Sequence, residues 1–221
     1  MKILVVAPHP DDELLGCGGT LLLRASKGDT IGWLLMTSIQ ESRGWSCERI
    51  EQRAFEIDRV RQGLCISPEH FYELKLPTAE LDQFPMSDLV GKISNVFASF
   101  EPNEVLLPFP GDIHSDHRVV FDAASSCTKW FRYPSVKRVL IYETISETDF
   151  SLDSCDFSPN LLIDITDHLE KKLRLLSIYK SEIGEHPFPR SLESLRAQAI
   201  LRGAQRGTQA AEAFQILRQF E

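Results

Sequence analysis

Residues 2–8 read KILVVAP and residues 9–13 read HPDDE, so a short apolar run is followed at once by ionisable side chains. The apolar run is rich in β-branched residues, which is typical of a strand buried on both faces of a parallel sheet. From Asp12 through Lys27 apolar residues recur at helical spacing, and Gly28 then favours the end of a helix. The opening of the chain therefore predicts a strand, a polar turn and a helix.

The same alternation of strand and helix continues through the rest of the chain. It predicts one α/β domain over residues 1–221, with a Rossmann-like, mostly parallel sheet and helices on both faces. In this architecture ligands bind beyond the carboxyl ends of the strands, so polar residues that directly follow a strand are the first candidates for a site. The further expected strands are 30–36, 70–74, 104–108, 138–142 and 160–163, and the further expected helices are 47–64, 87–100, one that starts near Asp116, 167–180 and 191–206.

The composition is that of an ordinary globular domain with an acidic balance. The 221 residues carry 24 Lys and Arg against 32 Asp and Glu, a formal net charge of -8. Binding to a nucleic-acid backbone needs a surplus of basic residues, so we do not expect a nucleic-acid partner. No apolar run approaches the roughly 18 residues of a membrane helix, and the first residues do not resemble a signal peptide. We therefore expect a cytoplasmic protein without a membrane span.

The cysteines indicate neither a disulfide framework nor a thiolate zinc cluster, because none of them forms a Cys-x-x-Cys pair and their number is odd. We expect most of them to be reduced and buried. The sequence leaves the oligomeric state open, with a homo-oligomer as one option. The five cysteines are Cys17, Cys47, Cys65, Cys127 and Cys155.

The turn after the first strand contains the residue types of a metal site. His9 and Asp12 are separated by two residues, which lets an imidazole nitrogen and a carboxylate oxygen reach one cation, and zinc accepts both kinds of ligand. The neighbouring Asp11 can then stay free as a proton acceptor. Acids at a helix start complement the helix dipole, so Asp12 and Glu13 alone would be explained as caps. Capping does not explain His9.

A second polar cluster, PFPGDIHSDH at residues 108–117, follows a later strand. Its prolines and glycine favour a loop, and His114 and His117 have the i, i+3 spacing that lets both face one cavity. A lone loop histidine is usually just solvated, but two histidines accompanied by Asp112 and Asp116 favour a site. Together the two clusters can supply two His and one Asp ligand with one position open, which is typical of catalytic rather than structural zinc.

These motifs resemble those of the LmbE-like or PIG-L zinc-dependent N-deacetylases, which remove an acetyl group from N-acetylglucosaminyl compounds. HPDDE at residues 9–13 matches the family's H-P-D-D-E motif, and HSDH at residues 114–117 matches its H-x-D-H motif. Weaker matches are RAFE at residues 53–56, and RG at 202–203 followed by AEAF at 211–214. The resemblance covers nearly the whole chain and implies a metal-dependent hydrolase.

By position, the resemblance also implies a role for each residue of the two motifs. Asp11 would be the general base that takes a proton from the zinc-bound water. His114, held by Asp116, would stabilise the oxyanion as imidazolium. Fe²⁺ is an alternative to Zn²⁺, because two histidines and one aspartate accept several divalent metals. The implied metal ligands are His9, Asp12 and His117.

Three further residues are candidates for substrate binding. Arg53 can contact sugar hydroxyls or a phosphate, or it can pair with Glu56 on the surface of its helix. Trp45 offers an apolar face to a sugar ring, unless the loop at residues 37–45 is simply solvated. Thr78 stands where many members of the family carry an acidic residue. The zinc chemistry is unaffected by this departure, but the identity of the substrate is left open.

The leading hypothesis is therefore a deacetylase of a small N-acetyl sugar or glycoconjugate. Alternatives are a sugar- or metal-binding protein that has lost turnover, and an amidase of another small amide of the thiol- or antibiotic-conjugate type. Loss of turnover would be indicated by replacement of Asp11 or His114, and both are present. A nucleotide-binding protein is disfavoured, because GCGG at residues 16–19 lies inside the first predicted helix and not in a turn after a strand.

Overall fold

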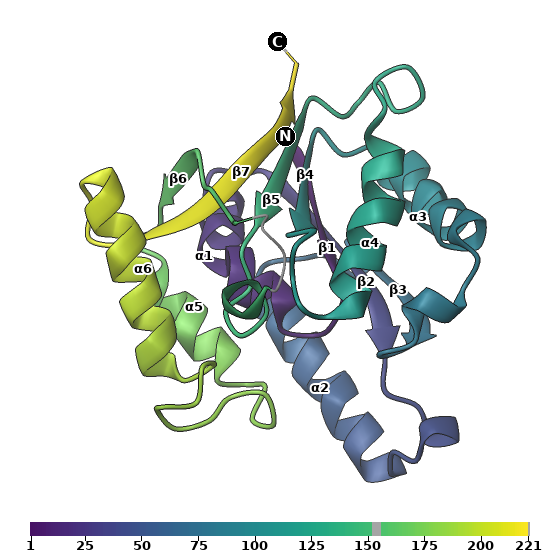
Figure 1. Cartoon of the computed structure of the whole chain (residues 1–221), viewed down its shortest axis with the longest axis horizontal. Coiled ribbons are helices and arrows are strands. Elements are labelled where there is room, and N and C mark those ends of the chain that lie inside the picture. Colours follow the sequence, from purple (N-terminus) through teal and green to yellow (C-terminus); the bar gives the residue numbers. More distant parts are fainter. Residues whose placement is uncertain (152–155, 221) are drawn as a thin grey trace.

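A computed structural model describes residues 1–151 and 156–220. Its centre is a seven-stranded sheet with the strand order β3-β2-β1-β4-β5-β7-β6 (Figure 1). The strands from β3 to β5 in this order are parallel, whereas β7 is antiparallel to both of its neighbours. The strands are β1 (Lys2–Ala7), β2 (Thr30–Ser38), β3 (Phe71–Pro77), β4 (Glu104–Pro108), β5 (Arg138–Tyr142), β6 (Leu161–Asp164) and β7 (Ala211–Gln219).

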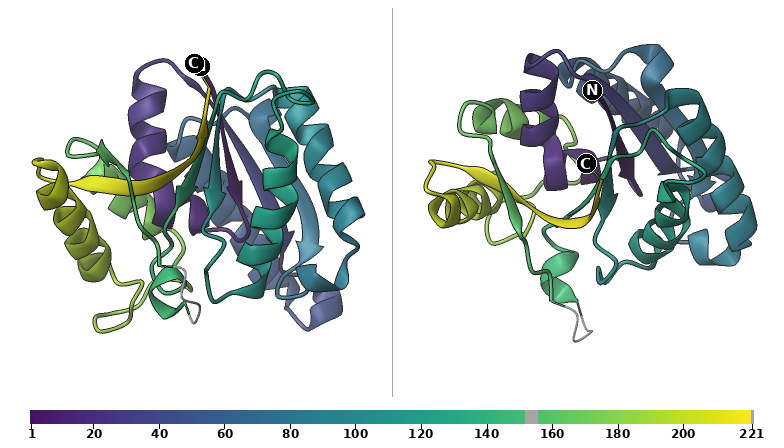
Figure 2. Two further views of the ribbon diagram at one scale, coloured as in Figure 1. Left: turned by 45° about the horizontal axis from the view of Figure 1, so that its top comes forward. Right: turned by 90° about the horizontal axis from the view of Figure 1, so that it is seen from above.

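Helices cover both faces of this sheet, with α3 and α4 on one face and α1, α5 and α6 on the other (Figure 2). The central strand β1 serves both cores, because Ile3 and Val5 belong to the core under α1 while Leu4 and Val6 belong to the core under α3 and α4. This explains why its sequence is continuously apolar. Among the described residues, no helix has both the length and the hydropathy to cross a bilayer. The helices are α1 (Asp12–Ser26), α2 (Cys47–Gly63), α3 (Met86–Phe100), α4 (Ser115–Ser125), α5 (Leu169–Leu176) and α6 (Leu192–Arg206).

The predicted fold class is confirmed, and the differences lie in the C-terminal part of the chain. The strand predicted at residues 160–163 is present as β6, but among the described residues it is an edge strand that pairs with β7 and is antiparallel to it. The strand β7 itself was not predicted, since a glutamate near its start breaks the apolar pattern of a buried strand. The helix predicted at residues 167–180 is shorter, because α5 ends at Leu176. Cys155 lies outside the described residues; the other four cysteines are free thiols.

Helix α1 is interrupted at Cys17, whose φ of −145° and ψ of 15° are not helical. Two glycines beside the break let neighbouring elements approach the helix backbone. A Cβ atom at Gly16 would collide with the ring of Tyr142, and one at Gly19 would lie 2.7 Å from Ile165. The glycines of the GCGG segment therefore allow α1 to pack closely against β5 and against Ile165, the residue that follows β6.

A buried ion pair supplies hydrogen-bond partners for the backbone groups at this break in the helix. An unbroken helix would join the N–H of Gly19 to the carbonyl of Leu15. Instead Glu212 accepts the N–H groups of Gly19 and Thr20 at 2.8 and 2.7 Å, and Lys172 donates to the Leu15 carbonyl at 2.9 Å. Lys172 and Glu212 are themselves 2.7 Å apart. The AEAF segment of the sequence thus supplies the carboxylate that completes α1.

We expect Glu212→Gln to lower the free energy of unfolding by about 3 kcal/mol, because it leaves the buried Lys172 as an uncompensated charge. Urea denaturation followed by circular dichroism measures the change. The matched control is Glu170→Gln, which breaks the exposed ion pair with Arg196 and should leave the transition midpoint unchanged within error. Equal shifts in the two variants would contradict the role assigned to Glu212.

Candidate active site

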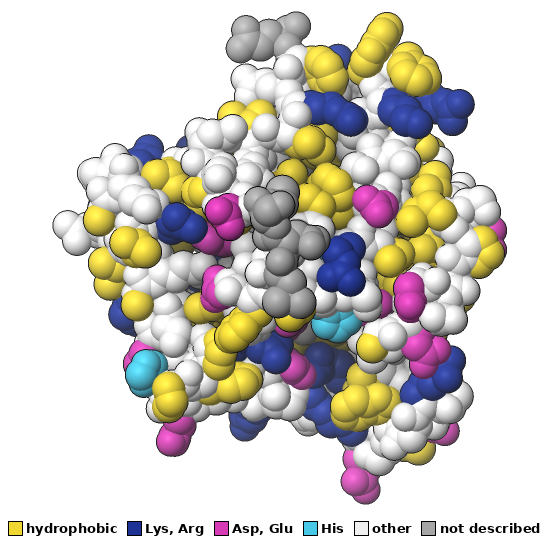
Figure 3. Space-filling view, viewed as in Figure 1, with side chains coloured by type: hydrophobic (Ala, Val, Ile, Leu, Met, Phe, Trp, Pro, Cys, Tyr) yellow, Lys and Arg dark blue, Asp and Glu magenta, His cyan; other side chains and the backbone are white. Residues whose placement is uncertain are grey.

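The two polar clusters of the sequence meet at the carboxyl ends of β1 and β4, which are neighbours in the sheet. A cavity of about 250 Å³ lies there. Figure 3 shows a histidine among acidic and basic side chains around a hollow near the centre of this face. Asp116 is fully buried behind the cavity. All the other residues predicted for the site line it: His9, Asp11, Asp12, Trp45, Arg53, Thr78, His114 and His117.

Three of these side chains form a group that can hold a metal ion: His9, Asp12 and His117. Oδ2 of Asp12 lies 3.4 Å from Nδ1 of His9 and 3.3 Å from Nε2 of His117. Ligand atoms of a tetrahedral zinc site, with bonds of about 2.0–2.1 Å, are about 3.3–3.4 Å apart. The spacing of the three side chains therefore fits one ion held between them.

Each histidine of this group is oriented by a carboxylate at its other ring nitrogen. Nε2 of His9 is 2.9 Å from Oδ2 of Asp116, and Nδ1 of His117 is 2.7 Å from Oδ2 of Asp112. Such contacts fix the tautomer and the ring orientation of a metal-binding histidine. They leave Nδ1 of His9 and Nε2 of His117 turned toward Asp12. The sequence analysis gave Asp112 no separate role.

A second group of possible ligands, His9, His114 and Asp116, fits a metal less well. Oδ2 of Asp116 already accepts the N–H of Ala79 at 2.7 Å and contacts His9, and Oδ1 accepts the N–H of Leu81 at 3.1 Å. These contacts occupy both oxygens of the carboxylate. Asp116 is therefore placed to orient the ring of His9, with no free oxygen for a metal ion.

His114 and Asp116 are in contact, and the roles expected for them in catalysis stay predictions. Nδ1 of His114 accepts the main-chain N–H of Asp116 at 3.1 Å, since His114 is the residue that caps α4. Burial, together with the charges of His9 and His117, lowers the pKa of His114 to about 4. The ring is thus neutral near pH 7, with its proton on Nε2, and it can donate a hydrogen bond. This differs from the imidazolium that the family resemblance implied.

The pKa values of the three ligands reflect how strongly they interact. Burial opposes the charge on His9, but hydrogen bonds with Asp116 and Asp12 raise its pKa to about 9. Burial likewise opposes the charge on Asp12, yet His117 and His9 lower its pKa below the usual range. Burial would lower the pKa of His117, whereas Asp12 and Asp112 raise it. A bound cation takes the place of protons shared within this group.

Asp11 is held in a strained backbone conformation at the edge of the cavity. Its φ of 132° lies in a region that favours glycine, and such strain costs about 1–3 kcal/mol. Its N–H donates to Oε2 of Glu13 at 3.1 Å, and its carboxylate lies 3.0 Å from Nη1 of Arg190. Burial and the charge of Asp12 raise its pKa to about 7, against the opposing effect of Arg190. A carboxylate with this pKa is suited to accept a proton near neutral pH.

The three predicted substrate-binding residues lie in the wall of the cavity, and their role in binding stays a prediction. Both alternatives for Arg53 apply, because its Nε is 3.2 Å from Oε2 of Glu56 while the side chain also lines the cavity. Nη2 of the same guanidinium pairs with Glu182. Trp45 is 42% exposed and lines the cavity.

Sequence analysis did not identify Arg190 or Glu182, which also line the cavity. Arg190 lies 3.0 Å from Asp11 and 3.7 Å from Glu182, so these residues link the general-base candidate to Arg53. No spacing rule connects Arg190 with Asp11, which is 179 positions earlier. The one available signal was an arginine directly before a helix cap, in HPFPRS at residues 186–191.

We expect His9→Ala, Asp12→Ala and His117→Ala to lose stoichiometric metal, because two ligands do not hold the ion tightly. Asp112→Asn should bind metal about 10- to 100-fold more weakly, since it removes only the group that orients His117. Metal content after dialysis and a competition titration measure both effects. The control is Asp122→Asn on the exposed side of α4, which should bind as the wild type does. Full metal retention in all three Ala variants would disprove the ligand assignment.

The chain is similar to several known proteins. The diacetylchitobiose deacetylase of Thermococcus kodakarensis is 26% identical over 229 residues, covering 98% of this chain and 83% of that protein. The structure of the N,N'-diacetylchitobiose deacetylase from Pyrococcus horikoshii has a TM-score of 0.78 at 23% identity, covering 98% of this chain and 84% of the other. The 4-carboxy-2-hydroxymuconate hydratase GalB from Pseudomonas putida KT2440 has a TM-score of 0.74 at 18% identity, covering 98% and 95%. The last two likenesses show the fold alone.

A match to a protein family identifies the relationship of this chain more specifically than the shared fold does. Residues 4–128, more than half of the chain, match the family described as PIG-L: GlcNAc-PI de-N-acetylase. The matched range contains both histidine motifs, from His9 to His117, and so includes every residue of the metal-binding group. The chain therefore belongs to the PIG-L family of de-N-acetylases.

Proposed function

We propose that this protein is a zinc-dependent hydrolase that removes the acetyl group from an N-acetyl amino sugar. The observation that carries the proposal is the spacing of 3.3–3.4 Å from the Asp12 oxygen to nitrogens of His9 and His117, in the same cavity as Asp11. The related diacetylchitobiose deacetylase of Thermococcus kodakarensis supports the substrate class. The same donors also accept Fe²⁺, so zinc is proposed as the preferred ion rather than the only one.

The residues of the chain divide the reaction between them. A zinc ion held by His9, Asp12 and His117 would polarise the amide carbonyl and lower the pKa of a water molecule toward about 7. Asp11 accepts the proton of the attacking water, which its raised pKa and its position at the cavity permit. His114 donates a hydrogen bond from Nε2 to the oxygen on which negative charge develops. Asp11 then returns its proton to the departing amine.

The cavity favours a small, uncharged sugar ring. Its volume of about 250 Å³ is at the lower end for a ligand site, so it encloses one ring while any further part of a glycoconjugate remains outside. The arginines in its wall are already paired with acids: Arg53 with Glu56 and Glu182, and Arg190 with Asp11. Their remaining N–H groups suit sugar hydroxyls rather than a second full negative charge.

We expect the zinc-loaded protein to release free amine from N-acetylglucosamine or diacetylchitobiose. Asp11→Asn should keep its metal but lose a factor of about 10² to 10⁴ in kcat, the usual contribution of a positioned base. Fluorescamine detection of the amine and metal analysis measure the two effects. Asp82→Asn, which changes an exposed acid outside the cavity, is the matched control.

One outcome of that experiment would contradict the proposed activity, and a second would contradict only the role of Asp11. A wild-type protein that binds zinc and the sugars without releasing amine would be a binding protein on the same fold. A near-native rate in Asp11→Asn would remove Asp11 from the role of base while leaving the deacetylase activity in place.

Trp45 tests how the sugar is held. It follows the short turn Glu41–Arg43, and Gly44 between them has a φ of 86° that favours glycine. We expect Trp45→Ala to raise KM several-fold for sugar amides and to leave the zinc content unchanged, because the ring provides apolar contact area and no metal ligand. Steady-state kinetics on several N-acetyl sugars measure the change. Unchanged kinetics would show that Trp45 is an exposed loop residue without a role in binding.

A cytoplasmic location and a homo-oligomeric state stay predictions.

A further inference from the structure

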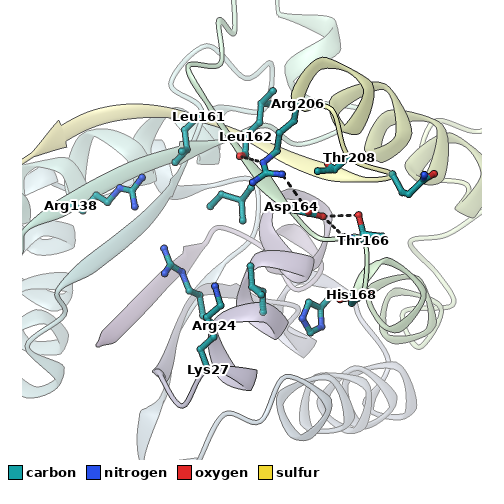
Figure 4. A pocket seen from close by; sticks show the side chains of 14 residues that line it. Arg24, Lys27, Arg138, Leu161, Leu162, Asp164, Thr166, His168, Arg206 and Thr208 are labelled. Atoms are coloured by element: carbon teal, nitrogen blue, oxygen red, sulfur yellow. Dashed lines mark hydrogen bonds and ion pairs between the residues drawn. The ribbon is translucent and has the colours of Figure 1, made fainter.

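A second cavity, of about 760 Å³, lies at the opposite end of the sheet from the candidate active site. Figure 4 shows it between the end of α1, which carries Arg24 and Lys27, and the β6 segment with Leu161, Leu162 and Asp164. Arg138 at the amino end of β5 and Arg206 at the end of α6 also line it. The catalytic candidates follow the carboxyl ends of the strands, so the two cavities are separate.

The charges around this cavity are unusual for a chain with a net charge of -8. Two acids line the cavity, Asp164 and Asp167. Asp164 is already engaged, because it accepts the N–H of Thr166 at 2.9 Å and lies 3.3 Å from Arg206. Four basic residues face these two acids: Arg24, Lys27, Arg138 and Arg206. Because the buried Glu104 also pairs with Arg24 and Arg138, four basic residues face three acids, and the cavity has a local excess of one positive charge.

Two of the arginines share one buried carboxylate. Oε2 of Glu104 lies 3.3 Å from Nη2 of Arg24 and 3.2 Å from Nη1 of Arg138, and Glu104 is 1% exposed. One negative charge thus serves two guanidinium groups and fixes their positions. Within the described part of the chain, Nη1 of Arg24 and Nη2 of Arg138 have no hydrogen-bond partner, and the two Nε atoms are buried without one.

We propose that this cavity binds a small phosphate monoester with an apolar body. Guanidinium groups held in place match the oxygens of a phosphate dianion, and Lys27 adds a third cation. Leu23, Leu161 and Ile163 form an apolar wall beside the cations, which suits the organic part of the ligand. The anion would supply the charge that Glu104 alone does not. This inference does not depend on the deacetylase reaction.

Isothermal titration with phenyl phosphate and with inorganic phosphate tests the proposal on the metal-loaded protein at constant ionic strength. We expect phenyl phosphate to bind more tightly than inorganic phosphate, because only the ester contacts the apolar wall. Arg138→Gln and Lys27→Gln should each weaken binding about tenfold, as expected for loss of one charge-assisted contact. Lys27 is exposed and unpaired among the described residues, so its variant keeps the test valid if Arg138→Gln does not fold.

Two arginine controls separate this site from other places where phosphate could bind. Arg196→Gln removes an exposed, carboxylate-paired arginine of α6 and should leave the affinity unchanged. Arg190→Gln alters the candidate active site and should also leave it unchanged. Binding that is lost in Arg190→Gln and kept in both cavity variants would place the phosphate in the active site and overturn the proposal. Absence of binding to the wild type at millimolar ligand would overturn it as well.

Discussion

The structure depends on the burial of three consecutive acids at the start of α1. Asp11, Asp12 and Glu13 are 3%, 2% and 0% exposed. Burying a carboxylate costs several kcal/mol unless it is paired or hydrogen-bonded, so each of the three requires a partner from elsewhere in the chain. Asp12 contacts His117 in α4, and Asp11 contacts Arg190 just before α6. Segments far apart in the sequence therefore pack against this one turn.

Glu13 shows how the same constraint positions Asp11. Its carboxylate accepts the hydroxyl of Tyr179 at 3.1 Å and the N–H of Asp11 at 3.1 Å. The second contact holds the backbone of Asp11 in its unfavourable conformation. By its sequence position Glu13 would be an ordinary acid at a helix start, but in the structure the conformation of Asp11 depends on it.

The local parts of the fold and site could be predicted from the sequence, and the distant pairings could not. Apolar periodicity is a property of neighbouring residues, so the KILVVAP strand and the α1 helix were predictable. The contact between Asp116 and His9 spans 107 positions, and that between Lys172 and Glu212 spans 40. Glu212 made β7 unlike a strand because its partner was unknown from sequence. Asp116 and Glu212 are both acids whose partners come near them only when the chain folds.

Charge balance distinguishes the two cavities, although arginines line both. In the candidate active site, each arginine has its own acidic partner. Arg53 pairs with Glu56 and Glu182, and Arg190 pairs with Asp11. In the second cavity, Arg24 and Arg138 divide a single carboxylate. A neutral ligand that donates and accepts hydrogen bonds is compatible with the first arrangement, whereas the second gains more from an anion. The charge of the ligand that each cavity favours therefore depends on how many acids pair with its arginines.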